Sequence, residues 1–356
     1  MNINRAQRVA ANMRTYGIRQ ILVTSPASVA YLTGVWVEPG ERMLALMMDA
    51  DGGAVLFANR MFAFPGGIVD VVEYDDTDDC IARLKGHIAP GELGIDKTWP
   101  SQFTLRLMAA RPDVRPVLGS APVDDARMIK DADETARLRA SSALNDRVLE
   151  ALCRTLAPGV TEAEACARYR ALAREMGAGG DSFSPLICFG ANGAEPHHAP
   201  GETRLSENDT VILDVGLNIG GALSDMTRTV FTGEPDALRR EVYGLVQAAN
   251  AAGRAAVRPG VKLCDIDRAA RDVIARGGYG ENFIHRTGHG IGMEVHEPPD
   301  VSAVSETVAQ PGMVFSVEPG IYLPGAFGVR IEDLVAVTED GCETLNHLTR
   351  DMTVLF

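Results

Sequence analysis

The chain has 356 residues, more than a single hydrophobic core usually supports, so we expect two domains. Its formal net charge of −14 argues against nucleic acid as a partner, because phosphate binding needs clustered Lys and Arg. No apolar run reaches the about 18 residues that cross a bilayer, and residues 1–18 lack the apolar segment of a signal peptide. We therefore expect a cytoplasmic protein without membrane contact. The six cysteines include no CxxC pair, which favours reduced, mostly buried thiols.

The first part of the chain predicts a small α/β domain. Three short apolar runs bounded by Pro, Gly and Asp indicate strands, at residues 20–25, 43–48 and 54–58. Asp51-Gly52-Gly53 separates the last two runs and predicts a hairpin turn, because Asp and Gly tolerate the positive φ of tight turns.

A second domain is expected to begin near Asp124. Residues 130–156 carry apolar side chains at i, i+3, i+4 and i+7, which predicts a long helix that ends before Pro158-Gly159. Thr161 and Glu164 have the spacing of a capping box at the start of the next helix. The predicted domains are therefore residues 1–124 and residues 125–356.

Two aspartates flank a predicted hairpin in the second domain. Residues 211–214 (VILD) indicate a strand that ends in Asp214, and residues 225–231 (DMTRTVF) indicate a strand that begins with Asp225. A turn centred between Ile219 and Gly220 makes the two aspartates cross-strand partners, with Cβ atoms roughly 5 Å apart.

Two glutamates flank a second predicted hairpin. It consists of residues 313–318 (MVFSVE) and 329–337 (VRIEDLVAV) and turns at Gly325. Glu318 and Glu332 are equidistant from this glycine and are expected to face each other. Because strand side chains alternate between two faces, Arg330 is expected on the face of Glu332.

Four carboxylates among apolar strands need positive charge nearby, because burial and mutual repulsion both disfavour the ionised form. Two divalent cations would balance them, and His289, which lies between two glycines, would add an imidazole ligand. Such a set of mostly oxygen ligands suits Mn²⁺ or Co²⁺, with Zn²⁺ and Fe²⁺ as alternatives. A single Asp at a strand end is more often a turn residue, so the prediction depends on the two acid-bearing hairpins occurring together.

Several motifs together suggest a family. They are residues 192–198 (NGAEPHH), 214–216 (DVG), 224–229 (SDMTRT), 287–292 (TGHGIG), 294–297 (EVHE), 316–322 (SVEPGIY) and 328–333 (GVRIED), with residues 31–34 (YLTG) near the N-terminus. In order and spacing the chain resembles the creatinase/aminopeptidase P/prolidase group of metallopeptidases over nearly its whole length. The resemblance implies an α/β N-terminal domain of creatinase type followed by an α+β catalytic domain with the pitta-bread fold.

The resemblance also implies roles for the acidic residues. Asp214 would bind one of two divalent metal ions, Asp225 and Glu332 would bridge both, and His289 and Glu318 would complete the other coordination sphere. This is the same ligand set that the two hairpins and the histidine indicate.

On the substrate side, the resemblance implies that His198 and His296 contact the scissile carbonyl. Arg330, His285 and Tyr322 are expected in substrate binding. The implied reaction is hydrolysis of the Xaa-Pro bond in dipeptides or short peptides by a hydroxide between the two metals, with Glu318 as general base. The expected partners are a short proline-containing peptide and, as in similar proteins, a second copy of the chain in a homodimer.

Alternatives stay open at this level. The chain could be an aminopeptidase acting on longer peptides, a hydrolase or lyase of a small non-peptide metabolite, or a peptide-binding protein without activity. Ala222 stands where proline-directed relatives commonly carry an aromatic residue, which leaves substrate detail at that edge open. The retained ligands argue against a metal-free enzyme of creatinase type, and the N-terminal domain argues against a methionine aminopeptidase.

Overall fold

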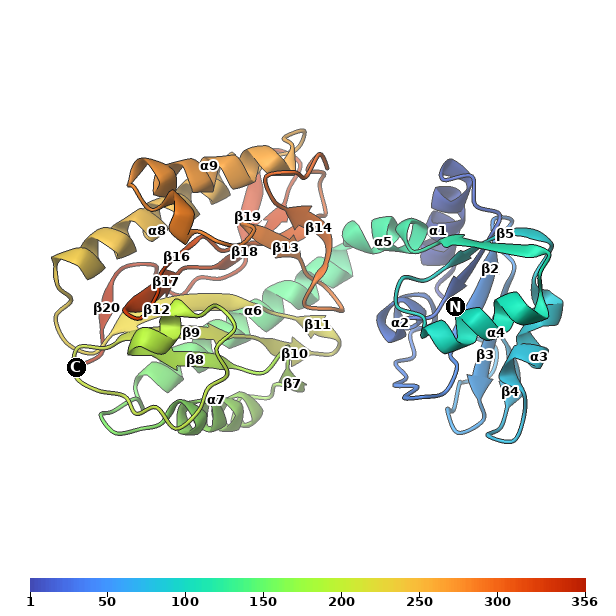
Figure 1. The fold of residues 1–356 in the computed structure, drawn as a ribbon, viewed down its shortest axis with the longest axis horizontal. Helices are drawn as coiled ribbons and strands as arrows, with labels where there is room; N and C mark the ends of the chain where they lie inside the picture. Colours follow the sequence, from blue (N-terminus) through green and yellow to red (C-terminus); the bar gives the residue numbers. More distant parts are fainter. The chain divides into compact units, whose positions relative to one another are not determined.

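In the computed structural model, which describes residues 1–356, the chain divides into two units, Met1–Arg127 and Met128–Phe356 (Figure 1). The first unit contains one mixed sheet of six strands in the order β4-β3-β2-β1-β5-β6. Its strands are β1 (Gln20–Val23), β2 (Ala45–Asp49), β3 (Ala54–Asn59), β4 (Asp70–Tyr74), β5 (Gly91–Ile95) and β6 (Val114–Leu118). Its helices are α1 (Ile3–Thr15), α2 (Pro26–Thr33), α3 (Cys80–Leu84), α4 (Ser101–Ala110) and α5 (Ala121–Met128).

The three strands and the hairpin predicted for the first unit are confirmed. Strands β2 and β3 pair antiparallel with Met48 opposite Ala54, and Gly52 in the turn has a φ of +101°. Alternate side chains of the sheet pack with helices α3 and α4 in one core that includes Leu22, Phe57 and Phe103. All six cysteines carry free thiols. None of the helices in either unit combines the length and the apolar character needed to span a membrane.

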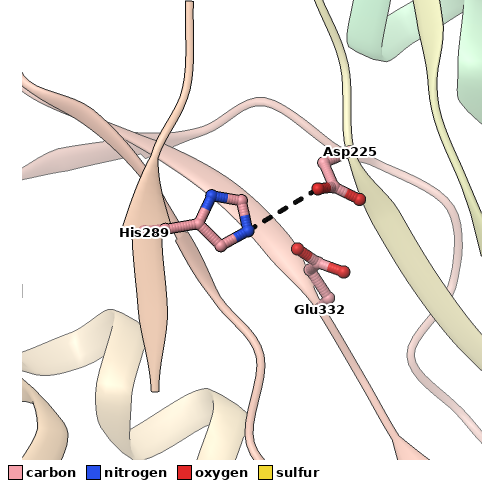
Figure 2. Close-up of side chains that lie close together, drawn as sticks. All are labelled: Asp225, His289 and Glu332. Carbon is pink, nitrogen blue, oxygen red and sulfur yellow. Dashed lines mark ion pairs between the residues drawn. The ribbon is translucent and has the colours of Figure 1, made fainter. Parts of the chain in front are cut away.

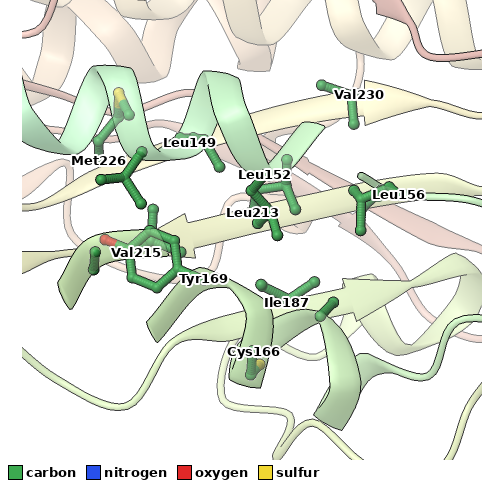
Figure 3. Packing of buried hydrophobic residues seen from close by; sticks show 14 of the residues in the cluster. Leu149, Leu152, Leu156, Cys166, Tyr169, Ile187, Leu213, Val215, Met226 and Val230 are labelled. Atoms are coloured by element: carbon green, nitrogen blue, oxygen red, sulfur yellow. The ribbon is translucent and has the colours of Figure 1, made fainter. Parts of the chain in front are cut away.

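The second unit begins with the two predicted helices. Helix α6 (Ala132–Cys153) starts at the N-cap Asp131 and helix α7 (Glu162–Glu175) starts at the N-cap Thr161, and each has a complete capping box. These helices pack on β8, β9 and β12 through a core that includes Leu149, Tyr169 and Leu213 (Figure 3). Helices α8 (Ala237–Ala256) and α9 (Leu263–Arg276) pack against each other in one core with Phe231, Ile321 and Val329. Leu263 and Ile266 of α9 also join a further core with β15 and β18.

Two principal sheets form the frame of the second unit. One has the strand order β20-β12-β9-β8 and the other has the order β14-β13-β15-β18-β19. Their strands are β8 (Leu186–Phe189), β9 (Thr210–Val215), β12 (Met226–Phe231) and β20 (Thr353–Val354), and β13 (Gly288–Gly290), β14 (Glu297–Val301), β15 (Val314–Val317), β18 (Asp333–Val337) and β19 (Cys342–Thr344). Smaller pairings join β7 (Gly180–Asp181), β10 (Leu217–Ile219) and β11 (Ala222–Leu223), and join β16 (Gly320–Leu323) to β17 (Phe327–Arg330).

The first acidic hairpin has a different register from the predicted one. Asp214 pairs with Thr227, not with Asp225, because the turn consists of Gly220 and Gly221, whose φ angles are +56° and +83°. Both central residues of a type I′ hairpin turn need positive φ, which two glycines adopt without strain. The predicted centre was therefore one residue too early, and Asp225 is displaced by two positions along the strand. A displacement of two keeps the side chain on the same face, so the two aspartates are diagonal neighbours.

The second acidic hairpin has the predicted register. Tyr322 pairs with Gly328 in β16 and β17, and Val317 pairs with Asp333 in β15 and β18. Both pairs are symmetric about Gly325, which has a φ of +73°. Glu318 and Glu332 occupy equivalent positions between the two paired segments.

A buried ion pair in the second unit offers a test of stability. Lys130 Nζ lies 2.7 Å from Glu297 Oε1, and the two side chains are 2% and 3% exposed. We expect Lys130→Met to lower the free energy of unfolding by about 3–5 kcal/mol, because the buried Glu297 carboxylate would lose the ammonium group 2.7 Å away. Urea denaturation followed by circular dichroism measures the change.

The matched control is Arg139→Met, which removes an ion pair between half-exposed side chains, with Glu343. Exposed pairs contribute at most about 1 kcal/mol, so this variant should denature close to the wild type. Equal shifts of the two denaturation curves would contradict the distinction between buried and exposed pairs.

Candidate metal centre

The five side chains predicted as metal ligands meet around one cavity of the second unit. Asp214 lies on β9 and Asp225 directly precedes β12, whereas His289 lies on β13 of the other principal sheet. Glu318 directly follows β15, and Glu332 directly precedes β18. All five line a cavity of about 500 Å³, so segments that are more than 100 residues apart in the sequence contribute to one site.

Three of these residues form the tightest group. One ligand atom each from Asp225, His289 and Glu332 lies within 4.8 Å of the other two, and all three residues are buried (Figure 2). His289 Nε2 is 3.7 Å from Asp225 Oδ2 and 3.3 Å from Glu318 Oε1. A single cation could contact all of these atoms after small side-chain adjustments.

The hydrogen bonding of His289 matches that of a metal ligand. Its Nδ1 lies 3.1 Å from the Gly290 carbonyl oxygen, which can only accept, so Nδ1 carries the proton. Burial lowers the pKa of His289 to about 4, which keeps the ring neutral. The Nε2 lone pair therefore faces two carboxylates, and this contact is repulsive without a cation between them. Metal-binding histidines commonly fix their second nitrogen on a carbonyl in this way.

The glycines beside His289 have a steric cause. A Cβ at Gly288 would collide with the Ser316 carbonyl oxygen of β15, and a Cβ at Gly290 would collide with the Pro298 carbonyl of β14. Strand β13 can lie between its two neighbours only because both flanking residues lack a side chain. The two glycines thus let β13 pair closely with both neighbouring strands, and this pairing fixes the backbone position of His289.

The protein itself compensates the carboxylates only in part. Burial raises the pKa of Asp225, Glu318 and Glu332, and repulsion from neighbouring carboxylates raises it further. Asp214 Oδ1, Asp225 Oδ1 and Glu332 Oε1 are buried and accept no hydrogen bond. A buried carboxylate oxygen without a donor is unfavourable, and divalent cations would satisfy all three atoms. The donor set therefore fits metal binding.

Arg330 is held beside the carboxylates by three hydrogen bonds. Its Nη2 donates to Asp214 Oδ2 at 2.6 Å, its Nε donates to Thr227 Oγ1 at 3.0 Å, and its Nη1 donates to the Tyr322 hydroxyl at 2.7 Å. The Thr227 hydroxyl in turn donates to Glu332 Oε2 at 2.7 Å. Arg330 and Glu332 thus contact the same threonine, as expected for two side chains on one face.

Tyr322 and His285 extend this chain of hydrogen bonds. His285 Nδ1 lies 2.7 Å from the Arg286 carbonyl oxygen and therefore donates, which leaves Nε2 to accept from the Tyr322 hydroxyl at 2.8 Å. Burial lowers the pKa of His285, consistent with a neutral ring. His285 and Arg330 line the cavity, whereas Tyr322 lies behind them. Tyr322 therefore orients two cavity-lining side chains and does not itself form the cavity wall.

Of the adjacent histidines His197 and His198, the structure brings the first to the cavity, not the second as expected. His197 lines the cavity, whereas His198 lies outside the lining, with Nε2 3.1 Å from Glu162 Oε2. The prediction placed His198 at the substrate, and the motif alone could not decide between two adjacent histidines. His296 also lines the cavity, with its ring centroid 4.2 Å from that of His289.

Comparison with known proteins decides the family. Residues 136–339 match the model of metallopeptidase family M24, and residues 5–129 match the creatinase/prolidase N-terminal domain. The chain belongs to metallopeptidase family M24. An uncharacterized peptidase of Staphylococcus aureus is 36% identical to this chain over 339 residues, which cover 91% of this chain and 93% of the relative.

Solved structures agree with this assignment to family M24. A prolidase from Thermococcus sibiricus superposes with a TM-score of 0.93, 33% identity and coverage of 99% of both chains. A dipeptidase from Mycobacterium ulcerans superposes with a TM-score of 0.92 and 34% identity, covering 99% of this chain and 97% of the other. The predicted creatinase-type N-terminal domain and pitta-bread catalytic domain are confirmed. The family implies divalent metal ions, which the uncompensated carboxylates fit.

Two hydroxyl residues of the site were missed at the sequence level. Thr227 bridges Arg330 and Glu332, and Ser316 donates to Glu318 Oε1 at 3.0 Å while accepting the His289 backbone N–H. Each stands two residues from a predicted ligand on the same strand, so strand alternation places it on the ligand face. This period of two is the signal that could have identified them.

Removal of metal should change the pH dependence of stability. In the metal-free protein the raised pKa values of Asp225, Glu318 and Glu332 mean that the folded state binds protons more tightly than the unfolded state. Its stability should therefore fall as the pH rises above the unfolded values of about 4 and through the folded pKa values. Thermal unfolding measured from pH 4.5 to 8 should show this decline after chelation.

Saturation with Mn²⁺ should remove the decline, and an excess of 100 times the dissociation constant adds about 2.7 kcal/mol of stability. The control is the metal-free double variant Asp225→Asn, Glu332→Gln, which lacks two of the titrating acids and should show a shallower pH dependence. An equal slope in this variant would mean that other groups cause the effect.

Proposed function

We propose that this M24 chain is a metal-dependent Xaa-Pro dipeptidase that uses two divalent cations, with Mn²⁺ the foremost candidate. The observation that carries the proposal is the set of three orphaned carboxylate oxygens and one imidazole lone pair that converge on a single cavity. The residues that would hold the metals are Asp214, Asp225, His289, Glu318 and Glu332.

The cavity supports a small substrate that contains proline. Its volume of about 500 Å³ is in the range of sites for small molecules. Phe183, Leu186 and Val295 contribute apolar surface to its wall, which suits the hydrocarbon part of a pyrrolidine ring. The relatives named prolidase and dipeptidase share this fold over nearly the full chain, which supports the same class of substrate.

Bound cations would neutralise the carboxylates and polarise both a water molecule and the scissile carbonyl. Glu318 is the proposed general base, because it lines the cavity and its Oε1 is oriented by the Ser316 hydroxyl at 3.0 Å. It takes a proton from the attacking water and delivers it to the proline nitrogen as the C–N bond breaks. His197 and His296, which line the cavity, are the proposed hydrogen-bond donors to the oxygen that becomes negatively charged.

The peptide specificity can be tested directly. The metal-stripped protein, reloaded with Mn²⁺, should release free proline from Ala-Pro. A tripeptide Ala-Pro-Ala, followed by product chromatography, distinguishes the alternatives. Cleavage of the dipeptide alone supports a dipeptidase, and cleavage of both peptides indicates an aminopeptidase. If neither peptide is cleaved by protein with two metals bound, the proposed function is wrong.

The role of Glu318 is tested by Glu318→Gln. The amide retains an oxygen that can contact metal but cannot accept the proton, so turnover of Ala-Pro should fall by at least about 100-fold. Metal content measured by mass spectrometry shows whether the loss is chemical or structural. A variant with full metal content and near wild-type turnover would remove Glu318 from the role of base.

A further inference from the structure

Outside the cavity, one fully buried carboxylate collects four potential donors. Glu162, the first residue of α7, is 0% exposed. Its Oε1 accepts the Phe189 backbone N–H and the Asn192 side-chain amide, each at 2.9 Å. Its Oε2 accepts the Gly201 backbone N–H at 3.0 Å and lies 3.1 Å from His198 Nε2. Both ends and the middle of the segment of residues 189–201 are thus attached to one side chain.

His198 completes this arrangement as a donor. Because Glu162 accepts from each of its other partners, His198 Nε2 carries the proton in this contact. Its Nδ1 is 3.8 Å from Glu195 Oε2, a side chain that is 77% exposed. The His198 ring is therefore directed toward Glu162 and away from the metal centre.

The attached segment presents His197 to the cavity. Residues 195–209 form neither helix nor strand, so sheet hydrogen bonds do not fix the direction of His197. On one side the segment packs on β17, where the Gly193 carbonyl occupies the space that a Cβ of Gly328 would need. On the other side it is held by Glu162. Pro196 and His197, which lie between these two attachments, form part of the cavity wall.

We propose that Glu162 and His198 are a positioning pair that fixes the His197 imidazole toward the reacting carbonyl. The expected effect on catalysis rests on the proposed dipeptidase function, whereas the expected effect on the position of His197 does not. Loss of the His198 donor leaves a buried carboxylate with one hydrogen bond fewer and removes the attachment next to His197, while Asn192 and Gly201 stay bound to Glu162. Small displacements of a group that acts in the transition state lower the rate strongly, which gives His198 an effect without substrate contact.

Conservative variants separate positioning from general destabilisation. A glutamine side chain places its amide nitrogen near the position of His Nε2, whereas asparagine reaches only the position of Nδ1. We expect His198→Ala and His198→Asn to lower kcat on Ala-Pro by about 10–100-fold, with KM changed less than about threefold. His198→Gln should stay within about threefold of the wild type. Glu195→Gln, the matched control at the exposed contact, should leave both constants unchanged.

A spectroscopic measurement keeps this test independent of activity. In protein loaded with diamagnetic Zn²⁺ and labelled with ¹⁵N-histidine, His198 should show a protonated Nε2. The ring signals of His197 should shift or broaden in His198→Ala and return to their wild-type positions in His198→Gln.

The outcomes are distinguishable. If the wild type cleaves no Xaa-Pro peptide, the proposed function fails, and the His197 signals alone decide the positioning role. If the wild type is active but His198→Ala retains its kcat and its His197 signals, the positioning pair is refuted. Should His198→Ala not fold, equal kcat values for the Gln and Asn variants overturn the proposal, and a higher kcat for Gln supports it.

Discussion

The concentration of four carboxylates among buried strands is the constraint on which the rest of the second unit depends. Burial and mutual repulsion raise the pKa of Asp225, Glu318 and Glu332, so the fold without cations holds acids in an unfavourable environment. The cavity-lining Arg330 contributes one positive charge and binds Asp214. One guanidinium cannot compensate four acids, and the site therefore depends on charge supplied from outside the chain.

This constraint explains why the ligands lie on or next to strands. Ligand geometry is held more precisely by a sheet than by a loop, because the strand backbone is fixed by its neighbours. His289 is flanked by two glycines because the carbonyls of the neighbouring strands leave no room for side chains there. Ser316 of β15 orients Glu318 two residues further along the chain, and Thr227 of β12 orients Glu332 from the other principal sheet. The cavity-lining His197 is the exception, since it lies outside the strands, and the neighbouring His198 and Gly201 contact the Glu162 carboxylate.

The comparison of sequence and structure shows where local rules are sufficient. The capping box at Thr161 and the symmetric register about Gly325 were predicted from short-range patterns, and the structure shows both. The other hairpin was placed one residue too early, because the sequence Asn218 to Gly221 allows several turn centres and only backbone φ values select between them. The error had little effect on the site, since the displaced aspartate stayed on the same face. By contrast, His197 and His198 are chemically identical neighbours, and only the position of Glu162 on a distant helix separates them.

Two adjacent buried acids, Glu332 and Asp333, show how the chain distinguishes a structural carboxylate from a functional one. Burial acts to raise the pKa of Asp333, but the guanidinium groups of Arg228 and Arg350 outweigh it and lower the pKa, with hydrogen bonds of 2.7–2.8 Å. Arg228 also donates to the Glu332 carbonyl oxygen at 2.6 Å, so the same ion pair fixes the backbone of the neighbouring residue. The Glu332 side chain receives a single hydroxyl donor and keeps one oxygen unsatisfied. Since the fold can supply full compensation one residue away, the uncompensated carboxylate of Glu332 indicates a position kept open for a cation.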